Sequence, residues 1–403
     1  MPHTFWNGAL PTASEKLGLW LVGASGNVAT TVAVGLAAMV SGRARPIGLL
    51  TESPACRGLR MVPLARIVLG GHEIARRTPL QTAQELSGQS GLFGADLLKA
   101  VAPALRQYGR RIRPGYDPNR SKQPSAASVI ARLRRDIESF QRAQRLARVV
   151  VIHVASAEAA FDARKLPREW TAFQGMLTRR SSAVLPSSVL YAIAAIEAGA
   201  AYVNFTPAVG ADLPAIRAFA AQRGAAIMGS DAKTGESLLR SVLAPMFSDR
   251  CLDVRSWTGA NLLGNRDGAN LSDERIKAAK LRSKDAILAS LLTPRPDTHT
   301  AIEFVASLHD WKTAWNHVHF AGFLGTPMTL QFTWQGCDSI LAAPLVIDLA
   351  RLTDLHRRRE KSGVMTHLAC FFKAPMDVRD HHFHRQMAAL HAYLDEARAE
   401  ARQ

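Results

Sequence analysis

A short glycine-containing turn near the start of the chain has the features of a phosphate site. It joins an apolar run, Leu19 to Val22, to a helical pattern that ends near Gly42, and Gly23 and Gly26 flank it. Glycines at such a turn let backbone N–H groups approach a pyrophosphate, and the start of the helix adds favourable positive potential. The turn therefore predicts nucleotide binding. Without the fuller GxGxxG, this spacing is also typical of a tight strand–helix turn that binds nothing.

Glu52 indicates which nucleotide would bind. The apolar run Pro46 to Leu50 predicts a second buried strand, and Glu52 stands at its end. A carboxylate there can accept hydrogen bonds from a ribose diol and repels a 2′-phosphate, so Glu52 favours NAD over NADP. Thr30 and Thr31, in the first turns of the helix, could add hydroxyl donors.

Three other motifs could do chemistry. GSDAKTGES (229–237) lacks the Gly-Lys-Ser/Thr triplet of a phosphate loop, which excludes a P-loop ATPase. Lys280 and Lys284 are four positions apart, so on a helix they would share one face, where such a pair is usually solvated. Like charges disfavour a helix unless an anion lies between them, so the pair also favours a phosphate or oxyanion site. DHHFH (380–384) has no adjacent carboxylate cluster, which predicts a solvated histidine tract and no metal site.

The elements that must position these residues alternate between strand and helix over the first part of the chain. The β-branched run 149–152 predicts a strand covered on both faces. The apolar spacing over 129–140 predicts the helix before it. The alternation continues with helix 188–198, strand 202–205, helix 212–222 with Asp212 as N-cap, and strand 225–228. This order predicts an α/β fold with a doubly wound parallel sheet.

The pattern changes after residue 237. A helix over 238–247 precedes Asn- and Gly-rich sequence, and the alternation over 328–334 predicts a strand with one covered face. Asp338 then opens an apolar helix, and one interpretation is that it is simply the N-cap of this helix. We expect the following division: an N-terminal tail 1–16, a nucleotide-binding domain 17–237, a second α+β domain 238–340, and a segment 341–403 that returns to the first domain.

Composition limits the class of protein. The chain has 403 residues and 47% apolar residues, which is ordinary for a globular protein. Its four scattered cysteines imply neither a disulfide framework nor a metal site and favour a reducing cytoplasm. The uncharged stretch 17–40 contains enough polar residues to favour a buried strand, turn and helix over a membrane span. We expect no membrane partner.

The net charge of +17 raises the question of nucleic acid. The arginine-rich runs, such as 106–122 and 357–359, carry no aromatic interleaving or zinc-finger spacing. A solvated basic surface is the simpler interpretation, and we expect no nucleic-acid partner.

Longer blocks of sequence resemble the myo-inositol-1-phosphate synthase family, and most of all its bacterial branch. The blocks are GGHEI, LPSSVLYAIAAIEAG, YVNFTP, GSDAKTGES, SWTGANLLGNRDGANLSD, SKDAIL and GFLGTPMTLQFTWQGCDSILAAPLVIDLARL. They stand in family order and cover most of residues 17–375. The resemblance implies a Rossmann-like doubly wound parallel sheet, interrupted by a second α+β domain that serves catalysis and assembly into a homotetramer.

The resemblance also implies a reaction. D-glucose 6-phosphate would become 1D-myo-inositol 3-phosphate with tightly held NAD, in inositol and phospholipid biosynthesis. The steps are oxidation at C5, enolisation at C6, intramolecular aldol closure onto C1 and re-reduction at C5. Enolate and alkoxide charges need fixed cationic donors in a dry site. Lysine suits this work because its charge is compact and its pKa shifts readily on burial.

Site residues follow from the same resemblance. The catalytic positions fall on Asp231, Lys233, Asp267, Lys280, Lys284, Lys312, Asp338 and Lys373. The cofactor-binding positions fall on Gly23, Gly26, Asn27, Glu52, Ser156, Glu158, Ser188 and Asp231. Lys373 would transfer the proton at the C5 hydroxyl. Lys280 and Lys312 would stabilise oxyanions near C1, and Lys284 would hold phosphate.

The chain departs from the family pattern at three places. Ser230-Asp231 stands where the family often has consecutive acids, so one carboxylate is missing, which counts against dependence on a divalent metal. A divalent metal or monovalent cation stays possible but unassigned. Glu73 replaces a commoner Asp, and Glu236 begins a departure from a Gln-Thr-Lys continuation. The alternatives are a related NAD-dependent cyclase on another sugar phosphate, an ordinary dehydrogenase that accumulates NADH, and a non-catalytic polyanion-binding protein.

Overall fold

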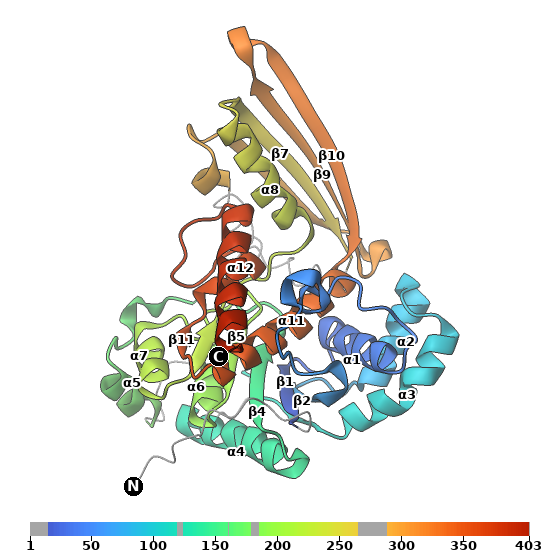
Figure 1. Cartoon of the computed structure of the whole chain (residues 1–403), viewed down its shortest axis with the longest axis vertical. Helices are drawn as coiled ribbons and strands as arrows, with labels where there is room; N and C mark the ends of the chain where they lie inside the picture. Colours follow the sequence, from blue (N-terminus) through green and yellow to red (C-terminus); the bar gives the residue numbers. More distant parts are fainter. Residues whose placement is uncertain (1–14, 119–123, 160, 179–184, 265–287, 403) are drawn as a thin grey trace.

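The computed structural model describes residues 15–118, 124–159, 161–178, 185–264 and 288–402. These residues form a seven-stranded sheet and a four-stranded sheet, and the smaller sheet projects above the larger one in Figure 1. The mixed α/β fold class predicted from the sequence is confirmed.

The larger sheet is parallel throughout and has the order β11-β6-β5-β4-β1-β2-β3. Its strands are β1 (Leu17–Val22), β2 (Ile67–Glu73), β3 (Ile112–Pro114), β4 (Arg148–His153), β5 (Ala201–Asn204), β6 (Ala226–Met228) and β11 (Gly363–Val364). The strand order reverses between β1 and β4. Ligands of such sheets bind at the carboxyl ends of the strands beside this reversal.

Helices cover both faces of the larger sheet. α11 packs on α1 and on β4, while α4 and α6 pack together against β4. β1 is accordingly buried along its whole length. The helices of this part are α1 (Asn27–Val40), α2 (Pro79–Ser90), α3 (Ala95–Gly109), α4 (Ala126–Gln144), α5 (Trp170–Leu177), α6 (Ser187–Glu197), α7 (Pro214–Gln222), α11 (Asp338–Arg358) and α12 (Phe383–Glu400).

The second strand was predicted in the wrong place. Residues 46–50 form no strand, and the chain instead continues through short 3-10 helices, of which η1 is Leu50–Glu52 and η2 is Pro54–Cys56. Gly48 has a φ of +85°, which interrupts an extended run. The carboxylate of Asp348 accepts the N–H groups of Leu50 and Thr51, so these groups need no strand partner. The second strand is β2.

The predicted N-cap of α7 is also wrong. The helix begins at Pro214 with Leu213 as its N-cap. Proline presets the φ of a first helical residue, which places the start two residues later than predicted. Asp212 forms an ion pair with Arg217, at 3.7 Å between Oδ1 and Nη1.

The smaller sheet has the order β10-β9-β7-β8 and is covered on one face by α8 (Gly235–Asp249). Its strands are β7 (Asp253–Leu263), β8 (Asp297–Phe304), β9 (Trp311–Ala321) and β10 (Pro327–Cys337). Leu330 and Phe332 pack into a small core with Phe247 and Trp257 beneath α8. This confirms the predicted strand with one covered face.

The two sheets are joined where the candidate site lies. The chain leaves the larger sheet through the loop before α8 and returns directly from β10 into α11. None of the described helices has the length and apolar character needed to cross a membrane.

Candidate functional site

A cleft of about 1010 Å³ lies at the carboxyl ends of the central strands of the larger sheet. Its walls include the loops that follow β1, β2, β4 and β5. The smaller sheet contributes Leu263, Ile302 and Lys312, and α11 contributes Asp338 and Ser339. The cleft therefore brings the predicted nucleotide turn and part of the predicted lysine–aspartate set into one space.

The glycine turn has the geometry of a phosphate cradle. Gly23 has a φ of +89°, and a Cβ there would lie 2.8 Å from the Ala155 Cα, so a side chain does not fit. Gly26 is the N-cap of α1, and the first turn of the helix carries no acidic residue. The first N–H groups of a helix lack intrahelical acceptors and attract anions. Asn27 and Val28 of this turn line the cleft, so the site fits a dinucleotide pyrophosphate.

Glu73 takes the place in the fold that was predicted for Glu52. It ends β2, lines the cleft, and accepts through Oε2 from the Ser25 N–H at 2.7 Å. Within the described chain Glu52 does not line the cleft, because η1 turns its carboxylate toward Arg351, 2.6 Å away. Glu52 was expected in the cleft because a strand was wrongly predicted at 46–50. GGHEI, noted for its family resemblance, was the available signal for Glu73.

A second group of polar side chains lies near the carboxyl end of β4 and consists of Ser156, Glu158 and Ser188. Ser156 and Glu158 line the cleft after β4. The Glu158 carboxylate accepts from the Ser188 N–H at 2.9 Å and from the Ser188 hydroxyl at 2.5 Å. Ser188 itself is buried behind this carboxylate. Ser188 therefore does not line the cleft and is linked to it through Glu158.

Asp231 and Lys373 come together across the sequence. Lys373 Nζ donates to Asp231 Oδ1 at 2.8 Å, and the Lys373 N–H donates to the Asp231 carbonyl at 2.7 Å. Asp231 has a φ of +59°, a left-handed conformation that is uncommon for residues other than glycine. Both side chains line the cleft and remain partly exposed, so they can reach a substrate there.

The remaining predicted catalytic residues have different positions. Lys312 on β9 and Asp338 on α11 line the cleft. Cys337, and not Asp338, is the N-cap of α11. Lys233 is buried outside the cleft lining and donates to Gln386 Oε1 at 2.7 Å. Burial lowers the pKa of Lys233 to about 8, and the positive charge of Lys373 acts in the same direction.

Three predicted catalytic residues cannot be placed. Asp267, Lys280 and Lys284 lie outside the described residues. Among the residues that are described, no group of three His, Cys, Asp or Glu side chains has the arrangement of a metal site. In the histidine tract, Asp380 Oδ1 accepts from the backbone N–H of His382 at 2.9 Å.

His153 is an unused polar group beneath the cleft. It ends β4, is fully buried, and neither ring nitrogen has a hydrogen-bond partner in the structure. Burial lowers its pKa to about 4, against a smaller opposing effect of the Glu158 charge. The imidazole is therefore neutral in the folded protein and packs edge-on against Tyr191.

Acid should therefore unfold the protein partly through His153. The unfolded chain binds the proton near pH 6.5 and the folded chain only near pH 4, so stability falls as pH decreases through this window. The contribution is about 1.4 kcal/mol per pH unit. The variant His153→Leu should lose less stability between pH 6.5 and pH 4 in urea denaturation. The exposed His391→Gln is the control, and an unchanged pH slope in His153→Leu would contradict the assignment.

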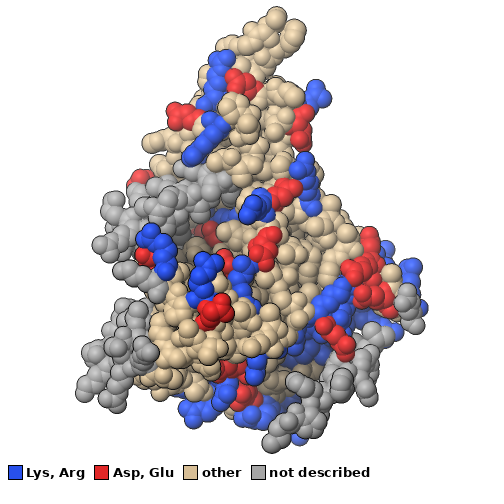
Figure 2. All heavy atoms as spheres, turned by 90° about the vertical axis from the view of Figure 1, so that its left-hand side faces the viewer, with Lys and Arg blue, Asp and Glu red and all other residues tan. Residues whose placement is uncertain are grey.

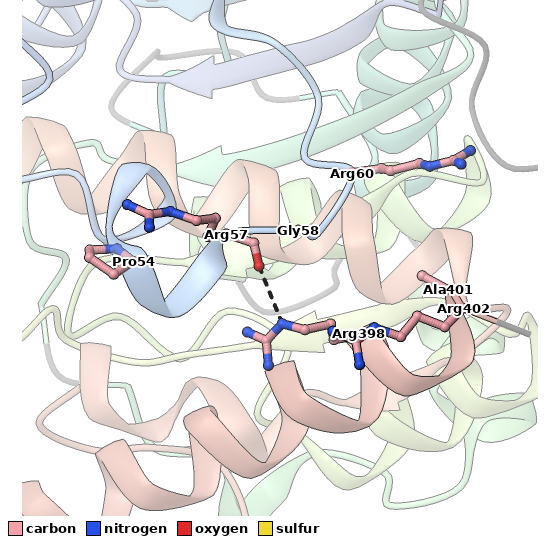
Figure 3. A pocket seen from close by; sticks show the side chains of 7 residues that line it. All are labelled: Pro54, Arg57, Gly58, Arg60, Arg398, Ala401 and Arg402. Atoms are coloured by element: carbon pink, nitrogen blue, oxygen red, sulfur yellow. Dashed lines mark hydrogen bonds between the residues drawn. The ribbon is translucent and has the colours of Figure 1, made fainter.

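A second cavity, of about 640 Å³, lies between η2 and the end of α12 and shares no lining residue with the cleft. Arg57 and Arg60 line it but extend in opposite directions (Figure 3). Arg398 is held by the carbonyls of Arg57 and Ala55. These arginines do not converge on one anion. On the face shown in Figure 2, basic and acidic side chains are interspersed. The cleft at the strand ends is accordingly the candidate site.

The fold and the cleft together define a class. A parallel sheet that carries a glycine turn at its strand-order reversal, with a lysine–aspartate pair in the same cleft, is typical of a Rossmann-like, dinucleotide-dependent enzyme. Comparison with known proteins narrows this class.

The family model described as Myo-inositol-1-phosphate synthase, an NAD-binding family, matches residues 17–395. The chain is 32% identical over 392 residues to inositol-3-phosphate synthase 1 of Bacteroides thetaiotaomicron, covering 92% of this chain and 91% of that protein. It is 26% identical to the inositol-3-phosphate synthase of Spirodela polyrhiza, over 96% of this chain and 81% of that protein. The protein belongs to the myo-inositol-1-phosphate synthase family.

Solved structures agree on the fold. The inositol-3-phosphate synthase of Caenorhabditis elegans matches 95% of this chain and 86% of its own with a TM-score of 0.84 and 23% identity. A myo-inositol-1-phosphate synthase-related protein of Thermotoga maritima matches 94% of this chain and 99% of its own with a TM-score of 0.75 and 17% identity. The overall fold is thus shared with these proteins.

Proposed function

We propose that this protein converts D-glucose 6-phosphate to 1D-myo-inositol 3-phosphate with NAD bound in the cleft. One observation carries the proposal beyond family membership. The Lys373–Asp231 pair and Lys312 line the same cleft as the glycine turn, so acid–base groups and the nucleotide site face one substrate volume.

The cofactor would be held by residues of the larger sheet. The pyrophosphate fits the turn at Gly23 and Gly26 and the first N–H groups of α1 at Asn27. Glu73, at the end of the second strand, is the better-placed acceptor for the ribose diol, in place of Glu52. When bound, NAD supplies reversible hydride acceptance, so that a carbinol carbon can be oxidised and later reduced.

The residues of the chain would supply charge and proton transfer. Lys373, oriented by Asp231, would take and return the proton of the C5 hydroxyl. Lys312 would stabilise oxyanion charge near C1, where a cationic donor in a water-poor cleft has most effect. Asp338 would orient the substrate at the start of α11. Lys280, Lys284 and Asp267 join this proposal through the family resemblance.

The decisive experiment is incubation with glucose 6-phosphate, with and without added NAD. Phosphorus NMR follows inositol phosphate, and absorbance at 340 nm follows NADH. The proposal expects product without net NADH. Accumulating NADH would indicate an ordinary dehydrogenase, and turnover of a different hexose phosphate would indicate a related cyclase. Strong salt-dependent binding to nucleic acid without turnover would indicate a polyanion-binding protein.

The biological setting belongs to the same proposal. The product would enter inositol phospholipid biosynthesis, and the enzyme would work in the cytoplasm. The four cysteines are free, which fits a reducing compartment. We also retain the division into domains 17–237 and 238–340, with 341–403 returning to the first.

A homotetramer is part of the proposal because the described residues leave one face of the smaller sheet uncovered. The strand register places Thr313, Trp315, His317 and His319 of β9 on the face opposite α8. Trp315 is 39% exposed there. Exposed aromatic residues are typical of protein interfaces.

Charge on this face should therefore disrupt assembly. Trp315→Glu would place a charge in the interface, and we expect a smaller particle by light scattering. Arg43→Glu, an exposed charge reversal outside the smaller sheet, is the comparison. A wild-type monomer, or a Trp315→Glu protein of unchanged mass, would refute the use of this face.

A further inference from the structure

Asp310 is a buried carboxylate with no role in the mechanism above. It precedes β9, is 3% exposed, and lies at the edge of the cleft. Its Oδ2 accepts from the Ser339 N–H at 3.1 Å, the Ser339 hydroxyl at 2.5 Å and the Cys337 thiol at 2.8 Å. Its Oδ1 accepts from Asn27 Nδ2 at 2.9 Å. Both oxygens are thus used.

These partners come from different parts of the fold. Asn27 is the first residue of α1 and lies in the nucleotide turn. Cys337 and Ser339 flank Asp338, where the smaller sheet returns to the larger one. The Asp310 carbonyl also accepts from the Asp338 N–H at 3.2 Å. One side chain therefore ties the nucleotide turn to the segment that carries Asp338.

The same residue is anchored from a third side. Its N–H donates to the Ser90 hydroxyl at 3.3 Å, and the neighbouring Trp311 indole donates to the Ser90 carbonyl at 3.0 Å. Ser90 ends α2, which belongs to the larger sheet's layer of helices. Lys312 follows Asp310 by two positions on β9, so the fixed Asp310 also fixes the strand that presents Lys312 to the cleft.

The partners of the Asp310 side chain are all hydrogen-bond donors. The donors named above are all neutral, and an isolated buried carboxylate is costly unless hydrogen bonds satisfy it. Burial and the Asp310 carboxylate raise the pKa of Cys337 to about 12, so the thiol keeps the proton that it donates. A charged acceptor makes these hydrogen bonds shorter and stronger than neutral ones. Four such hydrogen bonds hold the junction together.

We propose that Asp310 is a positioning residue that locks the nucleotide turn to Lys312 and Asp338. This inference rests on the proposed function, since it fixes the distance between bound NAD and the groups that act on the sugar phosphate. Near-attack geometry is sensitive: a displacement of about 1 Å costs on the order of 100-fold in rate. Asp310 acts through its neighbours and needs no contact with the reacting atoms.

The test is Asp310→Asn, which keeps the shape and presents an amide N–H₂ to donors. We expect kcat to fall about 100-fold and the NAD dissociation constant, measured by calorimetry, to rise about tenfold. The KM for glucose 6-phosphate should change little. Asp253→Asn, an exposed aspartate on β7, is the matched control and should retain full activity. Wild-type kcat and NAD affinity in Asp310→Asn would overturn the proposal.

A double-variant cycle separates positioning from folding. Asn27→Ala should also weaken NAD, and combining it with Asp310→Asn should weaken NAD no further, because both remove one coupled contact. Additive losses of NAD affinity would overturn the proposal that Asp310 positions the nucleotide turn. If Asp310→Asn fails to fold, Ser339→Ala retains the carboxylate and should still lower kcat about tenfold; an unchanged kcat would count against the proposal. A wild-type protein without turnover would refute the proposed function, whereas the NAD cycle would still test Asp310.

Discussion

Replacement of Lys373 by methionine is expected to remove turnover while NAD still binds. Lys373 Nζ lies 2.8 Å from Asp231 Oδ1, and both side chains line the cleft. Methionine has a similar length but cannot take or give a proton. Loss of a positioned acid–base group costs about 10²–10⁴-fold in rate. The kcat for inositol phosphate, followed by phosphorus NMR, should fall by that factor.

Two controls keep this result specific. The NAD dissociation constant of Lys373→Met should stay within about threefold of wild type, less than 1 kcal/mol of binding energy. Lys361→Met also removes a lysine paired with a carboxylate, since Lys361 Nζ lies 2.6 Å from Glu396 Oε1 outside the cleft. This variant should turn over normally. Full turnover by Lys373→Met would rule out its proposed role in proton transfer.

The sequence predicted most of the larger sheet because its strands and helices are locally consistent. β1, α1 and β4 are continuous apolar or β-branched segments with clear ends. β2 was missed because Gly70 and Gly71 lower its strand propensity. A Cβ at Gly71 would lie 2.2 Å from the Leu21 carbonyl oxygen, so close packing against β1, which no local pattern reports, requires the glycines.

The candidate site was less predictable from local pattern. The glycine turn is a contiguous motif, and its helix and strand follow from periodicity. Asp231 and Lys373 are separated by 142 positions and meet only when the loop after β6 pairs with the segment after β11. Only the family resemblance predicted that Asp231 and Lys373 belong to one site. Asp310 has no signal in the periodicity of the chain, since its importance comes from contacts with Asn27 and Ser339 across the fold.

Glu236, one of the residues that depart from the family pattern, is half of a buried ion pair. Its Oε1 lies 2.8 Å from Arg240 Nη2, and both side chains are 1% exposed. Arg240 Nη2 also donates to Asn316 Oδ1 at 3.3 Å, beneath the smaller sheet. α8 carries this pair and follows directly on the loop that holds Asp231. The pair thus joins α8 to the smaller sheet.

Removing one member of this pair should destabilise the protein strongly. Arg240→Met leaves the Glu236 carboxylate buried without its cation, which costs about 3–5 kcal/mol. Glu236→Leu combined with Arg240→Met removes both charges, and such replacements are often neutral. The double variant should therefore be more stable than Arg240→Met. The measurement is urea denaturation followed by tryptophan fluorescence, because the Arg240 guanidinium lies 6.0 Å from the Trp257 ring.

The comparison between the two variants decides what the pair does. Equal losses in both would mean that the arginine stem, and not its charge, supports α8 through packing. A stable double variant that has lost turnover would mean that Glu236 and Arg240 orient the Asp231 loop and contribute little to the stability of the fold. We expect the double variant to keep both stability and NAD affinity, since the Asp231 N–H donates to the Thr206 carbonyl and Lys373 donates to the Asp231 carboxylate, and neither partner lies on α8.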